Sequence, residues 1–395
     1  MFDPVEDIIE AIKRGEMVII TDDENRENEG DLVMAAELVT PEAINFMVTH
    51  GRGLVCTPVD QATAKRLNLR KMAETDDHFH TAFTVSLDAK KDVTTGISAG
   101  DRARTISTMV DAASSADDFV FPGHIFPLIA KDGGTLVRAG HTEAAVDLAV
   151  LAGLKPAGVI CEIMNEDGSM SRIPDLDLFR KKHNLKWCSI EELIKYRRKN
   201  EVLIACEQTA KLPTRHGEFD ISVYSASVDD KEYVALTYGD LGNGENVLVR
   251  VHSECLTGDV FGSARCDCGD QLDFAMKKIV EVGRGAIIYL RQEGRGIGLI
   301  NKIHAYKLQD EGLDTVEANH QLGFKADLRE YGIGAQILHD LGVKSVKLLT
   351  NNPRKLIGIE GHGIKIVGRE PIICEHTPHN KGYLSTKKQK LGHML

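Results

Sequence analysis

The sequence has 395 residues, a formal net charge of −11 at neutral pH, and 42% hydrophobic against 27% charged residues. This length is typical of two or three domains, and the composition is that of a soluble globular protein. The acidic balance argues against a nucleic acid or an anionic membrane as partner. No apolar run approaches the ~20 residues that cross a bilayer. The N-terminus is acidic and amphipathic, unlike a signal peptide, so we expect a cytoplasmic protein.

The first half of the chain predicts alternating helices and strands. Asp3 and Glu6 have the spacing of a capping box, and Gly15 ends the helix that they begin. The later elements expected here are a buried strand at 17–21, a helix from Thr40 to near Gly51, a strand at 81–88, a helix at 141–153 capped by Thr142, and a strand at 159–164.

A domain boundary is expected near residues 199/200. Ser189 and Glu192 form another capping-box pattern, and their helix ends in the basic run K-Y-R-R-K-N. A new strand pattern, E-V-L-I-A-C, follows at once. Because helices and strands alternate on both sides, we expect two consecutive globular domains, 1–199 and 200–395, each of the α/β (mixed α+β) class.

Three of the eight cysteines, Cys255, Cys266 and Cys268, have metal-like spacing. Their spacing is too irregular for the paired C-x-x-C knuckles of a zinc ribbon. Three thiolates and a water form a catalytic zinc site, whereas three thiolates and a histidine, His252 or a distant one, form a structural site. The spacing alone leaves both open. Without a secretory signal, a disulfide framework is not expected.

A glycine-rich loop follows the strand predicted at 286–290. The segment R-Q-E-G-R-G-I-G leads into a helical pattern, and a strand, a glycine loop and a helix N-terminus together form a backbone-amide cradle for phosphate. The spacing fits neither a P-loop nor a dinucleotide fingerprint. Zinc-activated water beside such a cradle suggests hydrolysis of a nucleotide or another phosphorylated substrate.

The second half resembles GTP cyclohydrolase II. The resemblance rests on the blocks R-V-H-S-E-C-L-T-G-D-V-F-G-S-A-R-C-D-C-G, R-Q-E-G-R-G-I-G-L, L-G-F-K-A-D-L-R-E-Y-G-I-G-A-Q-I-L and L-L-T-N-N-P-R-K. It implies zinc on the three cysteines with water as fourth ligand, and Mg²⁺ with the triphosphate. It also implies Asp327 as a proton acceptor, Arg329 as the group that attacks the α-phosphate, and Tyr306 as a group that assists ring opening. The GTP contacts that it implies are Arg250, Val251, His252, Ser253, Glu254, Gln271, Glu293, Gly294, Arg295, Thr315, Thr350 and Lys355.

Carboxylates gather early in the first half. Glu27, Glu29 and Asp31 alternate behind an apolar strand, so in an extended segment all three would face one way. Like charges packed together need a cation, and Mg²⁺ or Mn²⁺ is the natural partner. The alternative is a solvated acidic turn.

Two later segments and a buried carboxylate favour a site. His124 lies in an apolar, proline-bounded turn, Arg138 and His141 precede a predicted helix N-terminus, and Glu162 lies in a buried strand. An arginine, two histidines and several carboxylates in apolar settings indicate a metal-assisted acid/base site for a phosphate ester.

These stretches and T-G-I-S-A-G-D-R-A-R-T-I (95–106) resemble 3,4-dihydroxy-2-butanone 4-phosphate synthase over nearly all of residues 1–199. The resemblance implies that Glu27 and His141 bind Mg²⁺ or Mn²⁺ and that His124 and Glu162 are the acid/base groups. The ribulose 5-phosphate contacts that it implies are Arg26, Glu27, Asp31, Arg138, Ala139, Gly140, His141, Thr142 and Glu162.

Together the halves resemble bifunctional riboflavin biosynthesis proteins, which implies one reaction on ribulose 5-phosphate, one on GTP, and a homodimer. The rival hypotheses are that one half is a scaffold, or that the second half senses GTP without converting it.

Two further features carry less weight. The His-x-His pattern at 76–80 lies in a polar loop, and Cys56 is as compatible with core packing as with a substrate contact.

Overall fold

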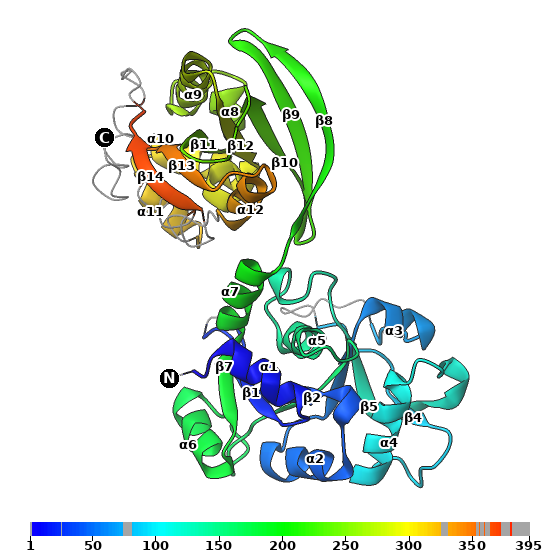
Figure 1. The fold of residues 1–395 in the computed structure, drawn as a ribbon. Helices are drawn as coiled ribbons and strands as arrows, with labels where there is room; N and C mark the ends of the chain where they lie inside the picture. The colour runs from blue at the N-terminus through cyan, green and yellow to red at the C-terminus, as the bar shows by residue number, and fades with distance from the viewer. Residues whose placement is uncertain are drawn as a thin grey trace. The chain divides into compact units, whose positions relative to one another are not determined.

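The structure is a computed structural model of the chain, and it describes residues 2–24, 26–73, 81–324, 331–352 and 364–372 together with Lys355, Ile359 and Asn380. The chain divides into two compact units, Met1–Asn200 and Glu201–Leu395, each built on a seven-stranded sheet (Figure 1). Both units combine helices with a sheet of parallel and antiparallel strands, which confirms the expected fold class. In the described parts of the chain, no helix has the length and apolar character of a membrane span.

The first sheet has the strand order β4-β5-β3-β6-β2-β1-β7, and only the β1–β7 and β3–β5 pairs are parallel. The bounds are β1 (Val18–Thr21), β2 (Gly30–Ala35), β3 (Cys56–Val59), β4 (Leu87–Ala89), β5 (Phe119–Ile129), β6 (Gly158–Glu162) and β7 (Lys186–Ser189). The helices are α1 (Val5–Lys13), α2 (Pro41–Phe46), α3 (Gln61–Arg66), α4 (Ala99–Val110), α5 (His141–Leu151), α6 (Ile173–His183) and α7 (Ile190–Asn200).

Strand alternation gives this sheet two apolar faces. Ile19 and Leu32 pack with α2, α4 and α6, whereas Ile20 and Val33 pack with α1, α5 and α7 on the other side. Figure 1 shows α5 on one side of the sheet and α2 and α4 on the other. The ladders pair Ile20 with Asp31 and Asp31 with Glu162, so these three residues form one row across the middle of the sheet.

Several local expectations for this unit are wrong, and each for a physical reason. The first helix begins at Val5 without a side-chain cap, because the Asp3 carboxylate accepts the Trp187 amide at 2.8 Å instead. Gly140, rather than Thr142, is the N-cap of α5. Only the end of the strand expected at 81–88 pairs regularly, as β4. The helix after Thr40 is capped by Thr40 as expected and closes in a π-helical turn, Met47–Gly51.

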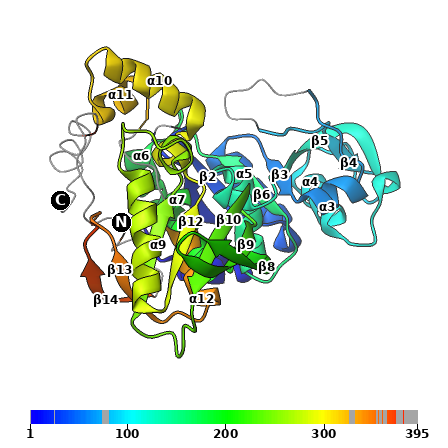
Figure 2. The same cartoon turned by 90° about the horizontal axis from the view of Figure 1, so that it is seen from above.

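The second sheet has the order β14-β13-β11-β12-β10-β9-β8. Its bounds are β8 (Ile204–Thr214), β9 (Gly217–Ala226), β10 (Asp229–Tyr238), β11 (Val247–Ser253), β12 (Gly285–Leu290), β13 (Ser345–Leu349) and β14 (Lys365–Glu370). The helices are α8 (Leu256–Asp259), α9 (Cys268–Val282), α10 (Gly298–Asp310), α11 (Thr315–Gln321) and α12 (Gly332–Asp340). Residues on α9 pack with Ile287 on one face, and residues on α12 pack with Ile288 on the other (Figure 2).

Three neighbouring strands of this sheet, β13, β11 and β12, are parallel. Their carboxyl ends therefore meet at one edge, the place where ligands bind in open α/β sheets. Glu254 and Cys255 follow β11, the segment from Gln292 follows β12, and Thr350 follows β13. Four of the residues predicted for this half, Glu254, Cys255, Glu293 and Thr350, follow these strands and therefore lie at this edge of the sheet.

Two candidate active sites

The site of the first unit lies where β1, β2 and β6 meet the N-terminus of α5. His141, the first residue of α5, is buried, and its Nε2 lies 3.2 Å from the Ile20 carbonyl oxygen. Its Nδ1 lies 3.7 Å from Glu27 Oε2 and 3.9 Å from Asp31 Oδ1. Asp31 and Glu162 are neighbours on the ladder between β2 and β6. The structure therefore brings Glu27, Asp31, His141 and Glu162 together.

Asp22 closes the loop that presents Glu27. Its carboxylate accepts the amides of Glu27 at 2.9 Å and of Glu29 at 2.8 Å, and the Arg26 guanidinium at 3.0 Å. Ligand atoms of Asp22, Glu27 and His141 all lie within 4.8 Å of one another. The expectation of an extended segment with Glu27, Glu29 and Asp31 on one face is wrong, because β2 begins only at Gly30 and the loop folds back on Asp22.

The electrostatics of this site favour a cation. Burial raises the pKa of Asp31 to about 8, and its Oδ1 has no hydrogen-bond partner among the described residues. Burial lowers the pKa of His141, but Asp31 and Glu27 outweigh this effect and raise it to about 9. The four carboxylates Asp22, Glu27, Asp31 and Glu162 outnumber the two cationic groups beside them, His141 and Arg26. Carboxylate oxygens are the ligands that Mg²⁺ prefers, so the donor set fits the implied ion.

Two arginines lie beside these carboxylates, and Arg26 Nη1 is 2.9 Å from Glu27 Oε1. Arg138 donates to Glu143 and to Thr81, the latter at 2.7 Å, and it lies beside Gly140 at the N-terminus of α5. A Cβ atom on Gly140 would lie 3.0 Å from the Arg26 guanidinium, so both arginines flank this turn. A helix N-terminus with two guanidinium groups is suited to a phosphate.

His124 lies on the same side of the sheet. Its Nδ1 is 2.7 Å from Asp88 Oδ2, and the other oxygen of Asp88 accepts the His124 amide at 2.9 Å. Glu162 Oε2 accepts the Leu54 amide at 2.8 Å, and Leu54 precedes by two residues the Cys56–Phe126 pair of β3 and β5. By the pairing of β5 with β3 and of β3 with β6, the backbones of His124 and Glu162 are about two strand spacings, or ~10 Å, apart. Cys56 is buried in the core against α5, and burial raises its pKa well above the ordinary value.

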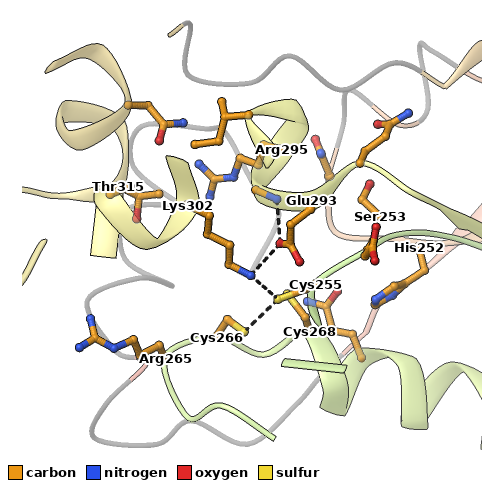
Figure 3. Close-up of a pocket in the computed structure, with 18 of the residues that line it drawn as sticks. His252, Ser253, Cys255, Arg265, Cys266, Cys268, Glu293, Arg295, Lys302 and Thr315 are labelled. Atoms are coloured by element: carbon orange, nitrogen blue, oxygen red, sulfur yellow. Dashed lines mark hydrogen bonds and ion pairs between the residues drawn. The ribbon is translucent and has the colours of Figure 1, made fainter. Parts of the chain in front are cut away.

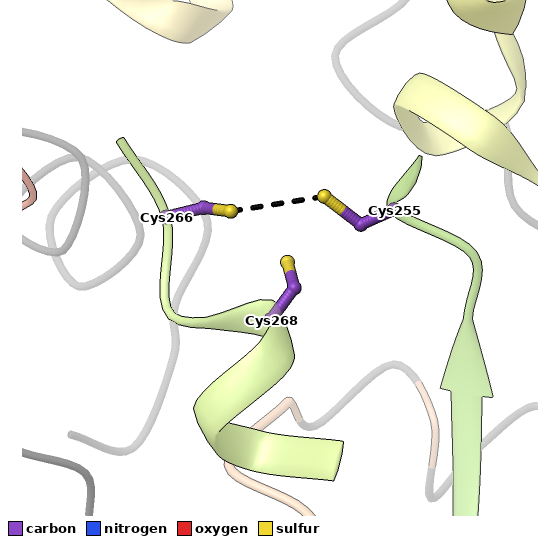
Figure 4. Close-up of side chains that lie close together, drawn as sticks. All are labelled: Cys255, Cys266 and Cys268. Carbon is purple, nitrogen blue, oxygen red and sulfur yellow. Dashed lines mark hydrogen bonds between the residues drawn. The ribbon is translucent and has the colours of Figure 1, made fainter. Parts of the chain in front are cut away.

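The three thiols of the second unit meet as their spacing predicts. Cys255 follows β11, Cys268 begins α9, and the sulfur atoms of Cys255, Cys266 and Cys268 all lie within 4.8 Å of one another (Figure 4). This group contains no histidine from the described part of the chain. His252 faces Asp259 instead, with its Nε2 at 3.1 Å from the carboxylate, so the structure lends no support to His252 as a fourth ligand.

A buried lysine, Lys302 on α10, contacts the thiol cluster. Its Nζ lies 3.2 Å from Cys255 Sγ and 2.8 Å from Glu293 Oε1 (Figure 3). It also lies 2.9 Å from Thr257 Oγ1. Burial lowers the pKa of Lys302, but the Glu293 carboxylate and the Cys255 sulfur outweigh it and raise it above the ordinary value. Hydrogen bonds from the other two thiols lower the pKa of Cys255, and Lys302 lowers it further. Lys302 thus lies in hydrogen-bond contact with a thiol whose ionisation its charge favours.

A pocket opens over these groups at the carboxyl ends of the parallel strands (Figure 3). Most of the expected GTP contacts line it. The lining residues are Arg250, His252, Ser253, Glu254, Cys255, Arg265, Cys266, Cys268, Gln271, Gln292, Glu293, Gly294, Arg295, Ile297, Lys302, Ala305, Tyr306, Gln309, Thr315, Asn319, Thr350, Asn351, Asn352 and Lys355.

Three of the expected residues are not among them. The side chain of Val251 packs in the core, and only its carbonyl oxygen faces the site, where it accepts Lys355 Nζ at 2.7 Å. Asp327 and Arg329 lie outside the described residues, as does the His-x-His pattern at 76–80.

The backbone of the glycine loop after β12 is left-handed at its three glycines and at the arginine between the first two. Gly294, Gly296 and Gly298 have φ values of 62°, 95° and 79°, and Arg295 between them has 64°. The Gly294 amide donates to its neighbour Glu293 at 2.8 Å, so this amide is directed at a carboxylate in the structure. The turn fixes Glu293 above the thiols and directs Arg295 into the pocket.

Comparison with known proteins agrees with these geometries. Residues 6–196 match the family model of 3,4-dihydroxy-2-butanone 4-phosphate synthase, and residues 205–371 match that of GTP cyclohydrolase II. The riboflavin biosynthesis protein RibBA of Bacillus cereus is 59% identical over 397 residues, and that of Bacillus subtilis is 60% identical over 398, each with full coverage of both chains. The chain belongs to the RibBA family of bifunctional riboflavin biosynthesis enzymes.

One solved structure resembles the RibBA chain over both units. RibBX of A. baumannii, described as a two-domain 3,4-dihydroxy-2-butanone 4-phosphate synthase, is 38% identical and superposes with a TM-score of 0.69 over 94% of this chain and all of its own. Only the synthase activity is named for that protein. The intact thiol cluster of the present RibBA family member is therefore a feature to test directly.

Several residues of the two RibBA sites escaped the sequence analysis. Asp22 and Asp88 contact Glu27 and His124, and their positions just after β1 and within β4 could have drawn attention to them. Lys302 and Asp259 carry no spacing signal. Lys302 is four residues before Tyr306, on the same helix face, which is the one clue the sequence offers.

Proposed function

We propose that residues 1–199 convert D-ribulose 5-phosphate to 3,4-dihydroxy-2-butanone 4-phosphate and formate, as a lyase. Residues 200–395 hydrolyse GTP to 2,5-diamino-6-(5-phosphoribosylamino)pyrimidin-4(3H)-one, formate and diphosphate, as a hydrolase. The observation that carries the proposal is that each unit has its own metal-suited cluster: carboxylates and an imidazole in the first, three thiols in the second. Membership of the RibBA family supports both reactions.

In the first unit, Glu27 and His141 would hold Mg²⁺ or Mn²⁺, which supplies charge stabilisation to a sugar enediolate when bound. Arg26, Arg138 and the N-terminus of α5 bind the sugar phosphate. Glu162 and His124 act as the acid/base pair, from strands β6 and β5 on either side of β3. Asp88 orients His124 from 2.7 Å.

In the second unit, the thiolates of Cys255, Cys266 and Cys268 would hold zinc, which supplies a hydroxide from bound water at neutral pH. Three thiols leave the fourth position to water, which is a catalytic arrangement. Tyr306, hydrogen-bonded to Thr257 at 3.1 Å, is positioned to give a proton to the opening ring. Glu293 contacts GTP, and Arg295 and Lys355 bind the triphosphate, together with Mg²⁺.

The roles of Asp327 and Arg329 follow from the family resemblance alone. We propose that Asp327 accepts a proton from Arg329 and that Arg329 attacks the α-phosphate of GTP. The remaining expected contacts, Gln271, Thr315 and Thr350, line the same pocket as the thiols and bind the nucleotide.

We propose further that the chain acts as a cytoplasmic homodimer. The support is the family resemblance, together with the location of both phosphorylated substrates inside cells. Sedimentation velocity of the full chain at micromolar concentration tests the assembly, and a single species with the mass of one chain would contradict it.

The test of the two activities is formate release from each substrate separately. Cys266→Ser is expected to lose only the GTP reaction, and Glu27→Ala only the sugar reaction. Cys206→Ser and Glu24→Ala, which change the same residue types at exposed positions, serve as matched controls and keep both activities. A wild-type chain that is inert toward one substrate would identify that half as a scaffold or a GTP sensor.

A further inference from the structure

Lys302 stands out among the residues that family resemblance does not assign. It is 8% exposed, it lies on α10, and its ammonium group has three acceptors within 3.2 Å: Cys255 Sγ, Thr257 Oγ1 and Glu293 Oε1. An ammonium group has three N–H donors, so these contacts use all of them. A buried lysine held by three acceptors has a defined position.

The three acceptors come from two loops that build the site. Cys255 and Thr257 belong to the turn after β11, whereas Glu293 begins the glycine loop after β12. Glu293 reinforces the link, because its second oxygen accepts the Leu256 amide at 2.7 Å. Lys302 therefore joins the segment that carries a thiol to the segment that binds substrate.

Lys302 also reaches Tyr306 through Thr257. Thr257 Oγ1 lies 2.9 Å from Lys302 Nζ and 3.1 Å from the Tyr306 hydroxyl. Lys302 and Tyr306 are four residues apart on α10, and the Lys302 Nζ lies 5.6 Å from the tyrosine ring centroid. A change at Lys302 is thus transmitted to the hydroxyl that faces the reacting ring.

The charge of the site explains why a lysine is suited to this position. Three thiolates and one divalent ion carry a net charge of −1, which is costly to bury without a nearby cation. Lys302 is in hydrogen-bond contact with one of these sulfur atoms. A donor to a ligating sulfur fixes its direction as well as balancing its charge.

We propose that Lys302 is a positioning residue that holds the Cys255 thiolate for metal binding and, through Thr257, holds the Tyr306 hydroxyl. The inference rests on the proposed zinc site of the second unit. It assigns to Lys302 a task that none of the expected contacts performs, since the other residues bind either the ion or the nucleotide.

The first experiment measures zinc affinity of the full chain by competition with a chromophoric chelator. Lys302→Met is expected to weaken zinc binding about 10- to 100-fold, the usual loss when a residue that supports a metal ligand is removed. Lys307→Met, an exposed lysine on the same helix, is the matched control and keeps wild-type affinity. In the cobalt-substituted protein, the sulfur-to-metal charge-transfer band is expected to shift for Lys302→Met alone.

The second experiment separates the two links of Lys302. Thr257→Val removes the hydroxyl that joins Lys302 to Tyr306 and that also lies 3.7 Å from Cys255 Sγ, and it leaves the Lys302–Cys255 contact. We expect a smaller loss of zinc affinity than in Lys302→Met, a lower kcat for GTP and an unchanged KM. A loss of zinc affinity as large as in Lys302→Met would contradict the division of roles.

The outcomes separate this inference from the proposed function. A wild-type chain that does not bind zinc refutes the metal site itself. If the wild type binds zinc and Lys302→Met has the same zinc affinity and the same cobalt band, only the role of Lys302 is overturned. If the methionine variant does not fold, Lys302→Gln replaces it. Glutamine removes the positive charge, so wild-type affinity and band in that variant would equally overturn the role.

Discussion

The Asp22 carboxylate accepts the backbone amide of Glu27 at 2.9 Å, and this bond turns the Glu27 side chain toward His141. The same carboxylate holds the Glu29 amide and the Arg26 guanidinium. Asp22→Asn replaces one acceptor oxygen by an NH₂ group that meets N–H donors. We expect a loss of about 1–3 kcal/mol in the free energy of unfolding and weaker Mn²⁺ binding, measured by electron paramagnetic resonance of the free ion.

The control for Asp22→Asn is Glu24→Gln, the same chemical change at an exposed position of the same loop. Trp187 is the single tryptophan of the chain and lies in the first unit, so its fluorescence follows the unfolding of that unit. Equal Mn²⁺ affinity in the wild type and Asp22→Asn would show that the loop does not position Glu27.

Gly140 is expected to control phosphate binding. An added Cβ would lie 2.9 Å from Glu143 Oε2 and 3.0 Å from the Arg26 guanidinium, and it would also clash with Arg138. The atoms that the Cβ would meet are the flexible ends of the Glu143, Arg26 and Arg138 side chains, which can move. Gly140→Ala is therefore expected to fold but to displace both arginines. We expect KM for ribulose 5-phosphate to rise on the order of 10-fold, since a hydrogen bond to a charged group is worth about 1.5–3 kcal/mol.

Steady-state kinetics with both substrates test the Gly140 prediction. Gly100→Ala on α4 is the control, because the nearest atom to its Cβ is 3.8 Å away. KM for GTP is expected to stay unchanged in both variants. A Gly140→Ala variant with a normal KM for the sugar and a lower kcat would locate the phosphate elsewhere.

The sequence predicted the second site better than the first because of the way each is built. Cys255, Glu293 and Thr350 each come just after a parallel strand, and parallel strands bring such positions to one edge. Strand patterns and chain order therefore carry most of the information. Lys302 was missed because its partners are 9 to 47 residues away, and nothing in its local pattern indicates them.

In the first site, pairing between distant strands decides the arrangement. Asp31 meets Glu162 through an antiparallel ladder of residues 31–35 with 158–162, which local periodicity does not predict. Glu29 was expected in the cation cluster, and Asp22 occupies that position because the loop folds back on it. Thr142 was expected to cap α5, but the chain enters the helix through Gly140, where both arginines gather.

Asp101 is expected to make the stability of the first unit depend on pH in the acid range. Its buried carboxylate accepts the hydroxyl of Thr94 at 2.7 Å and the amides of Thr94 and Gly96 at 3.0 Å. The Thr94 side chain above all lowers the pKa of Asp101 to about 2, below its ordinary 3.8. Since the folded pKa is lowered, the stabilisation is complete above the unfolded value and is lost as the pH falls from about 4 to 2.

Asp101→Asn is therefore expected to reduce stability above pH 4, and its difference from the wild type is expected to shrink toward pH 2. Urea unfolding followed by Trp187 fluorescence between pH 2 and 7 measures this difference. Asp132→Asn, at an exposed position of the same unit, is the control. Asp101 holds Gly96, and Gly96 lies against the Asp88–His124 pair. The rate of the sugar reaction is therefore also expected to fall in Asp101→Asn. A difference in stability that is independent of pH would contradict this reading.

Gly258 is the glycine on which the thiol cluster depends. It lies in α8, and a Cβ at this position would be 2.8 Å from Cys266 Sγ, 3.1 Å from Cys255 Sγ and 3.0 Å from the Cβ of Cys268. Its φ is not in the left-handed region, so the backbone accepts alanine, and the nearest conflicts are with the three cysteines. Such contacts force the sulfur atoms to shift by several tenths of an ångström. Zinc–sulfur bonds of about 2.3 Å leave little room for this shift.

Gly258→Ala is expected to fold with a loss of about 1–3 kcal/mol from overpacking. It is expected to bind zinc more weakly than the wild type and to lose the GTP reaction while keeping the sugar reaction. Gly334→Ala on α12, where the nearest atom to an added Cβ is 3.5 Å away, controls for a glycine-to-alanine change in the same unit. The cobalt spectrum of Gly258→Ala is also expected to differ from that of Lys302→Met, because alanine conflicts with all three cysteines, whereas methionine removes a contact to Cys255 alone. Full zinc affinity in Gly258→Ala would mean that the thiols reach the ion from positions other than those described.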